Sequence, residues 1–396
     1  MGAHRLSTIT ERLLEQEAAL FRFFSDSAWA RRDPADPEVA DLVVGNPHEM
    51  ALPAFVEAIQ RWAVPRDPAW YAYKFNEPYA QEAAAAGLRD RRGIPFEPQD
   101  VFLTDGAFTG LNLCIRIVAD PGDEVVFLSP PWFFYAALIV AQGVTPVRAL
   151  VDRTTWDPDP EALGAAITER TRAVIVNSPN NPTGRIYPPE TLQRLAATLT
   201  AASERIGRPI YLISDEAYSR IVFDDREFRS PTELYPHSFL VYTYGKQLLT
   251  PGQRLGYVAL PPTMPDRGPI RDALQLAQIS LGGNGVPNAV MQRALADLDG
   301  LSVDVKALQR RRDRLTEVLR SSGYELPHTE GTFYLFPTSP IPDDLAFVDR
   351  LSRDKVFVLP GSLVESPGRF RISVTGNDDM VERAIPVFQA AARELR

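Results

Sequence analysis

Lysine is scarce in this 396-residue chain, because of its 42 Lys and Arg residues only Lys74, Lys246, Lys306 and Lys355 are lysine. Cysteine is scarcer still: Cys114 stands alone, which excludes a disulfide within the chain and a metal site built from thiolates. No run of about eighteen apolar residues occurs, so no segment is expected to span a membrane. The charged N-terminus does not resemble a secretory signal. We therefore expect a cytoplasmic protein with no bound metal.

Other absences exclude whole classes of function. The net charge is −9 and the basic residues are scattered, which argues against nucleic acid as a partner. No G-x-G-x-x-G follows an early strand, so a nicotinamide dehydrogenase is poorly supported. Only about forty residues precede the stretch VVGNP, which is too short for a DNA-binding domain with a linker. A transcriptional regulator is therefore disfavoured.

The middle of the chain alternates short apolar runs with helical patterns. Residues 123–129, 173–178, 210–216 and 239–245 read as buried strands, and residues 188–207 read as a helix. This rhythm predicts an α/β fold with a mostly parallel sheet covered by helices. From residue 286 one long charged helix to residue 323 is expected, followed by short strands. We expect residues 46–285 to form a large domain, and residues 1–45 with 286–396 to form a smaller α+β domain.

Lys246 lies in the stretch YTYGKQLLTPGQRLGY, among glycines and aromatic residues. Arginine can replace lysine as a surface charge, but it cannot act as an amine nucleophile. Arg254 could clamp a phosphate with its planar fork, and Thr243 could donate a hydroxyl to the same group. Upstream, Gly106 lies in a strand-to-helix turn whose free N–H groups suit an anion, although any such turn can use glycine.

Polar residues also follow two other predicted strands. Asp215 ends one of them, and a buried carboxylate there needs a positive partner such as a protonated pyridine nitrogen. Tyr218 and Asn181 could hydrogen-bond a phenolic oxygen on the same ring, although the PNNPTG stretch that contains Asn181 can equally be a tight turn. Trp132 could stack on a flat ring, or it could be part of the core.

These groups together fit one molecule, pyridoxal 5'-phosphate. They supply donors for a phosphate, a carboxylate for a ring nitrogen, donors for a phenolate and a stacking face. The remaining group is an amine that can condense with the aldehyde. A free lysine, with a pKa of about 10.4, is almost fully protonated at neutral pH. Desolvation and the nearby Arg254 would help to deprotonate it. We therefore expect Lys246 to carry the cofactor as a Schiff base.

The chain also resembles the fold-type I pyridoxal-phosphate aminotransferases of classes I and II, which are related to aspartate aminotransferase. The resemblance covers nearly the whole chain and rests on an ordered series of motifs. These are VVGNP, TDGAFTG, PPWFFY, NSPNNPTG, SDEAY, GQRLGY, GTFYLFP and VLPGSLVESPGRFRISVT. One departure is Gly245, which stands where the family usually has a serine just before the lysine.

The resemblance implies specific roles. Residues 46–285 would be the cofactor-binding domain, with Lys246 in the Schiff base and Asp215 on the ring nitrogen. Arg371 would grip the substrate α-carboxylate, and Gly45 would let the N-terminal segment close over it. Tyr73 would reach the phosphate of the neighbouring subunit in a homodimer. The residues implied for the cofactor as a whole are Tyr73, Gly106, Ala107, Trp132, Asn181, Asp215, Tyr218, Thr243, Lys246 and Arg254.

The reaction implied is transfer of an amino group between an α-amino acid and a 2-oxo acid. The same cofactor cradle also serves lyases, decarboxylases and oxidases, and a specialised biosynthetic enzyme of that kind is the main alternative. The sequence does not identify the substrate side chain. Phe23, Phe24, Phe133 and Phe134 could favour an apolar or aromatic group, or could be core.

Overall fold

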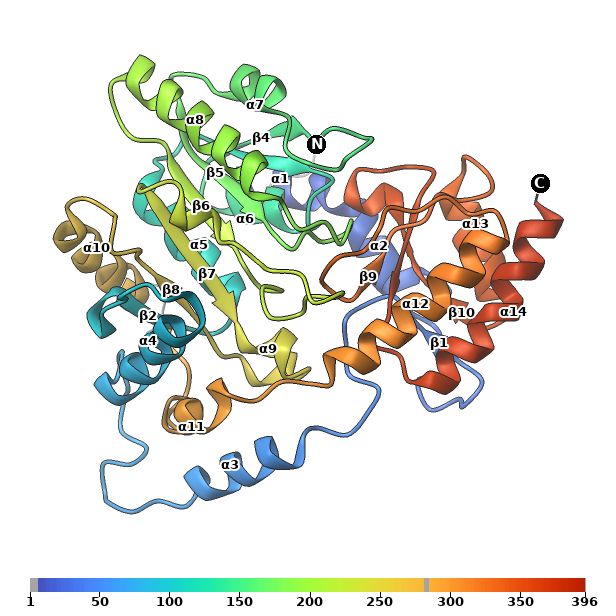
Figure 1. Ribbon diagram of the computed structural model, residues 1–396, viewed down its shortest axis with the longest axis horizontal. Helices are drawn as coiled ribbons and strands as arrows, with labels where there is room; N and C mark the ends of the chain where they lie inside the picture. The colour runs from blue at the N-terminus through green and yellow to red at the C-terminus, as the bar shows by residue number, and fades with distance from the viewer. Residues whose placement is uncertain (1–5, 281–284, 396) are drawn as a thin grey trace.

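A computed structural model describes residues 6–280 and 285–395 and confirms the α/β prediction (Figure 1). Its centre is a seven-stranded sheet with strand order β2-β8-β7-β6-β5-β3-β4. In this sheet every strand runs parallel to the others except β8, which is antiparallel to both neighbours. The strands are β2 (Val101–Thr104), β3 (Glu124–Ser129), β4 (Thr145–Leu150), β5 (Thr171–Asn177), β6 (Tyr211–Asp215), β7 (Ser238–Thr243) and β8 (Gly256–Ala259).

Helices cover both faces of the sheet because successive side chains of each strand point to opposite sides. In β3, Val125 and Phe127 join one apolar cluster, with residues of α5 (Ala107–Val118), α6 (Tyr135–Ala141) and α10 (Arg267–Ser280). Val126 and Leu128 join another, with residues of α7 (Pro160–Ala166) and α8 (Pro189–Ile206). A third cluster places α3 (Pro53–Ala63), α4 (Pro78–Arg92) and α11 (Ala289–Asp299) beside β2, β7 and β8.

The C-terminal part builds two smaller sheets. One pairs β1 (Ala40–Asp41) with β10 (Val356–Phe357), and the other has the order β11 (Leu359–Pro360), β12 (Phe370–Ser373), β9 (Tyr334–Leu335). Its helices are α12 (Val305–Ser321), α13 (Asp344–Ser352) and α14 (Asp378–Glu394). The N-terminal helices α1 (Thr8–Gln16) and α2 (Ala18–Asp26) lie near α6, which α1 contacts.

The prediction of one long helix over residues 286–323 is wrong, because two helices, α11 and α12, occupy this stretch. Gly300 follows the last residue of α11, and the Asp304 carboxylate accepts a hydrogen bond from the Ala307 N–H at the start of α12. Glycine favours a helix end, and an aspartate cap favours a new beginning. The linker is anchored by the Val303 N–H, which donates to the Gln247 carbonyl at 2.9 Å.

The domain boundaries stay a prediction. Residues 1–5 and 281–284, which belong to the predicted N-terminal segment and large domain, lie outside the described residues. Helix α11 was assigned to the smaller domain, yet it packs against α3 and α4. Within residues 6–280 and 285–395, no helix is long and apolar enough to cross a membrane.

Candidate active site

A cavity of about 190 Å³ lies at the carboxyl ends of β5, β6 and β7, the edge at which parallel sheets bind ligands. Helix α9 (Tyr244–Gln247), which carries Lys246, directly follows β7 at this edge (Figure 1). Nearly all of the predicted site residues line the cavity, and Gly106 and Tyr73 are the two that do not. Those that do are Gly45, Ala107, Trp132, Asn181, Asp215, Tyr218, Thr243, Lys246, Arg254 and Arg371.

One end of the cavity is suited to an anion. Gly106 has φ +81° and directly precedes α5, whose first N–H groups have no partner within the helix. A side chain at Gly106 would place its Cβ 2.8 Å from Arg254 Nη2, so glycine keeps backbone and guanidinium close together. Position 256 also requires glycine, because a Cβ added there would lie 2.8 Å from the Gly106 Cα. Arg254 donates to the Asp105 and Pro251 carbonyls at 2.9 and 2.8 Å.

Thr243 lies at the same end but is already engaged. Its hydroxyl donates to the Leu255 carbonyl at 3.2 Å and accepts from the Gly245 N–H at 3.3 Å, which caps α9. To donate to a phosphate, the Thr243 hydroxyl would have to leave Leu255. The serine that the family usually has at position 245 would place its Cβ 3.1 Å from the Pro251 Cα, which is a tight contact.

Asp215 is buried at the end of β6 and held by two donors. The Tyr135 hydroxyl donates to Asp215 Oδ2 at 2.6 Å, and the Ala217 N–H donates to Oδ1 at 3.2 Å. Burial raises the pKa of the Asp215 carboxyl, while these two donors and the Lys246 charge act against that rise. Since no basic side chain within residues 6–280 and 285–395 contacts it directly, the carboxylate is suited to a cationic ligand group.

Tyr135 was missed by the sequence analysis. It begins α6, four residues beyond the Pro130-Pro131 pair, and only its hydrogen bond across to β6 reveals its relation to the site. Trp132 lines the cavity and contacts the Tyr135 ring edge to face, with centroids 5.5 Å apart. A stacking role for Trp132 stays a prediction.

Lys246 lines the cavity, and its Nζ lies 5.8 Å from the ring centroids of both Tyr218 and Phe333. Burial raises the pKa of the Tyr218 phenol well above its usual range, so its hydroxyl stays a hydrogen-bond donor. Lys246 therefore lines the cavity beside a phenol that can donate to the same ligand.

Arg371 also lines the cavity and is only 1% exposed. Its Nη1 donates to Asn181 Oδ1 and its Nη2 to the Val43 carbonyl, both at 2.9 Å. Its Nε has no hydrogen-bond partner. Burial lowers the pKa of Arg371, because the charged form loses hydration. No carboxylate of the described residues pairs with this guanidinium, so it can accept an anionic ligand.

Tyr334 is a second residue that the sequence analysis missed. The Arg371 guanidinium lies 4.0 Å from its ring centroid. Burial raises the pKa of the Tyr334 phenol, whereas the nearby Arg371 and Lys246 charges lower it. The net result is a lowered pKa. A Cβ at Gly45 would lie 2.8 Å from the Tyr334 hydroxyl and 2.3 Å from Phe333, so only glycine fits beside them.

Tyr73 does not reach this cavity in its own subunit. Its side chain is 92% exposed, on the segment between α3 and α4. A contribution to a neighbouring subunit stays a prediction. Among the described side chains, no group of three or more His, Cys, Asp or Glu residues could hold a metal ion.

Comparison with known proteins gives a consistent result. The sequence profile of aminotransferase class I and II matches residues 37–388. An aspartate/prephenate aminotransferase of Thermus thermophilus is 31% identical, over 89% of this chain and 90% of its own length. An aminotransferase structure from Eubacterium rectale has a TM-score of 0.85 at 29% identity, covering 100% of this chain and 97% of its own. The Thermus thermophilus aspartate aminotransferase structure with maleate has a TM-score of 0.81 at 26% identity, covering 98% and 100%.

Proposed function

Because the chain belongs to the class I and II aminotransferases, we propose that its cavity binds pyridoxal 5'-phosphate on Lys246 and exchanges an amino group between an α-amino acid and a 2-oxo acid. One observation carries the proposal. The Lys246 amine lines one small cavity together with the Arg254 guanidinium, a buried carboxylate and a buried arginine that has no carboxylate partner among the described residues. Each of these groups lacks a partner that this cofactor and its substrate would supply.

The residues present fit the cofactor at each of its polar positions. Gly106, Ala107, Arg254 and Thr243 would hold the phosphate, since glycine at 106 and 256 leaves room beside the Arg254 guanidinium. Asp215 would pair with the protonated ring nitrogen, which would relieve the cost of its burial. Asn181 and Tyr218 would donate to the ring oxygen. Asn181 is free to do so because only its Oδ1 is used by Arg371.

When bound, the pyridine ring supplies an electron sink for the substrate α-carbon. Arg371 binds the α-carboxylate of the amino acid and so fixes which bond at the α-carbon faces Lys246. The Lys246 amine takes the α-proton and later returns a proton. The Tyr135 hydroxyl holds Asp215 in place, and Asp215 keeps a proton on the ring nitrogen.

A lyase, decarboxylase or oxidase could use the same cradle, and one experiment separates these reactions from transamination. The purified, cofactor-loaded protein is given one amino acid and no oxo acid. We expect the release of at most one equivalent of oxo acid per active site, after which the reaction stops until a 2-oxo acid is added. Continued turnover on amino acid alone would contradict transamination and favour a lyase or an oxidase.

The cavity walls also favour a class of substrate side chain. The cations that line it are Lys246, Arg254 and Arg371, each with a role above, and no further cation of the described residues lines it. Part of the wall beside Arg371 is aromatic, since Phe133 lies 5.7 Å from its guanidinium and in turn contacts Phe24. We therefore propose an apolar or aromatic donor, in contrast to the aspartate named for several relatives. Faster single-turnover reaction of L-aspartate than of L-phenylalanine would contradict this.

Exposed apolar side chains support the homodimer. They cluster on the segment between α3 and α4 and on α10, and a patch of this kind marks an interaction surface. Its members are Val64, Tyr71, Tyr73, Phe75, Leu276 and Ile279. We further propose that the cofactor domain spans residues 46–285, and that the protein acts in the cytoplasm.

A further inference from the structure

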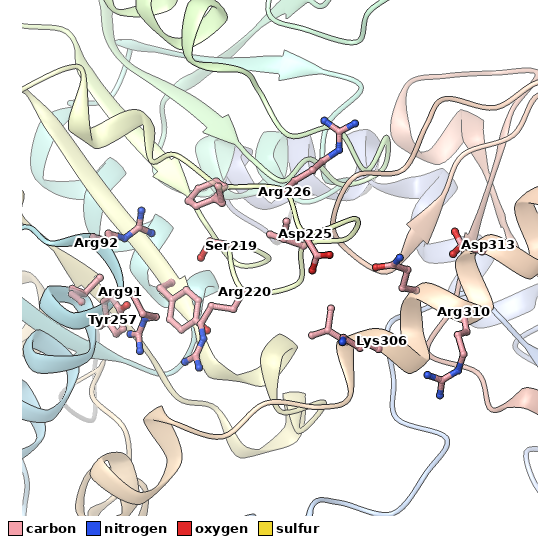
Figure 2. Close-up of a pocket in the computed structure, with 16 residues that line it drawn as sticks. Arg91, Arg92, Ser219, Arg220, Asp225, Arg226, Tyr257, Lys306, Arg310 and Asp313 are labelled. Carbon is pink, nitrogen blue, oxygen red and sulfur yellow. The ribbon is translucent and has the colours of Figure 1, made fainter.

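A second cavity is larger than the one that contains Lys246. It measures about 810 Å³ and shares no lining residue with the Lys246 cavity. Its walls come from α4, from Tyr242 and Tyr257 of β7 and β8, from the segment 219–228, and from the first turns of α12 (Figure 2). We call it the basic cavity, because its charged lining is Arg91, Arg92, Arg220, Arg226, Lys306 and Arg310 against Asp225 and Asp313.

Some of these cations are already neutralised. Arg91 lies 2.6 Å from a carboxylate oxygen of Asp299, and Arg92 pairs with the buried Glu216. Arg226 lies 3.0 Å from Glu330. These three arginines therefore shape the walls and carry fixed charge, but they add little net charge to the cavity.

The remaining cations have no such compensation. Arg220 Nη1 donates to the backbone carbonyl of Asp299 at 2.6 Å, and the Asp299 carboxylate is taken by Arg91. Within residues 6–280 and 285–395, no carboxylate pairs with Arg220 or with Lys306. Arg310 lies 3.9 Å from Asp304 with both side chains mostly exposed, an arrangement that is worth little.

The opposing carboxylates are fewer. Asp313 lies 2.6 Å from the Arg312 Nε, so its charge is partly used outside the cavity. Asp225 is left to balance Arg220, Lys306 and Arg310. A concave wall with surplus positive charge raises the local concentration of anions. This surplus occurs in a chain whose net charge is −9, so it does not follow from overall composition.

The cations also stand on different walls. Of the uncompensated cations, Lys306 and Arg310 extend from α12, while Arg220 comes from the segment 219–228 (Figure 2). A single carboxylate offers one anionic group, whereas a ligand with two anionic groups can pair with cations on both walls. A diphosphate offers two anionic groups in a row, and guanidinium forks match phosphate oxygens. We propose that the basic cavity is a binding site for a small molecule that carries a diphosphate group.

The walls of the basic cavity connect to the Lys246 cavity through neighbouring residues. Ser219 and Arg220 directly follow Tyr218, and the Tyr242 hydroxyl donates to the side chain of Gln247, next to Lys246. Binding is nevertheless tested separately from catalysis, so the result does not depend on the proposed reaction. The probe is inorganic pyrophosphate, titrated calorimetrically at constant ionic strength into protein saturated with pyridoxal 5'-phosphate, which fills the anion end beside Arg254.

We expect one pyrophosphate bound per chain, and at least tenfold weaker binding by the double variant Arg220→Gln/Lys306→Gln. The matched control is Arg12→Gln/Arg393→Gln, which removes the same charge from exposed positions outside the cavity and should leave the affinity within twofold of the wild type. Circular dichroism verifies that each variant is folded. If the Arg220/Lys306 variant proves unfolded, the single variant Lys306→Gln, at an exposed position, replaces it with an expected loss of at least threefold. The proposal is overturned if the wild type shows no saturable binding, or if cavity and control variants lose affinity equally.

Discussion

Replacing Arg371 tests whether the buried guanidinium recognises substrate or supports the fold. Arg371→Lys keeps the charge but cannot form two parallel hydrogen bonds to a carboxylate. A hydrogen bond to a charged group contributes about 1.5–3 kcal/mol, and about 1.4 kcal/mol corresponds to a tenfold change in rate. Loss of one such bond therefore lowers kcat/KM about 10- to 150-fold for every α-amino acid, whatever its side chain. Steady-state assays with a panel of amino acids measure this.

The stability of the free protein separates the two roles further. Arg371→Met removes the two hydrogen bonds that the charged guanidinium donates to Asn181 and Val43, which together contribute about 3–6 kcal/mol. It also removes a buried cation that has no carboxylate partner, and this gain offsets the loss. We expect the free energy of unfolding to change by less than about 2 kcal/mol, by urea denaturation. A loss of about 3–5 kcal/mol, typical of a broken buried ion pair, would refute the reasoning. So would an equal fall in activity toward simple amines that lack a carboxylate.

Three further predictions concern other parts of the site. Lys246→Ala, and equally Lys246→Arg, should abolish turnover and leave no borohydride-reducible link between protein and cofactor; mass spectrometry that finds the reduced link on another lysine would overturn the assignment. Tyr135→Phe removes a donor that lowers the pKa of Asp215, so the acidic limb of the kcat–pH profile should shift to higher pH, whereas Tyr211→Phe at the other end of β6 should leave it unmoved. If Tyr73 serves the neighbouring subunit, a mixed dimer of one Lys246→Ala chain and one Tyr73→Ala chain has one site with both substitutions and one site with neither. Mixing the two inactive variants should then restore up to about half of one wild-type dimer's activity per mixed dimer. No recovery despite demonstrated subunit exchange would contradict a shared site.

The position of the site could be predicted from sequence because the topology brings strand ends together. Asn181, Asp215 and Lys246 follow three different apolar runs, and parallel strands place such residues at one edge. Arg371 and Gly45 lie far from those runs in sequence, and no spacing rule links them to Lys246. They were found through resemblance. The fold brings Arg371 to the cavity by pairing β12 with β9 and β11. The segment that leads to Gly45 is held beside β12, because the Ser373 N–H donates to the Leu42 carbonyl at 2.8 Å.

Tyr135 and Tyr334 could not be assigned to the site because both lie in aromatic stretches, WFFY and TFYLF. In such stretches any of the rings could equally be buried in the core. Which phenol faces a polar partner depends on where the helix or strand begins, and a shift of one residue would turn a different ring inward. The break between α11 and α12 was missed for a related reason. Its signals, Gly300 and Asp304, lie within a long helical pattern in which single residues of either type are tolerated.

The charges of the Lys246 cavity argue for its ligand more strongly than its shape does. In the part of the chain that the structure describes, Arg371 is buried without a carboxylate partner and Asp215 without a direct basic partner. Both arrangements cost free energy in the free protein. They do not neutralise each other, because Arg371 donates to Asn181 and Val43 while Asp215 accepts from Tyr135 and Ala217. Such an arrangement persists where a ligand supplies the missing partners, a carboxylate for the arginine and a cationic nitrogen for the aspartate. An amino acid and a pyridine ring carry these two groups, and the Lys246 amine lies in the same cavity as both.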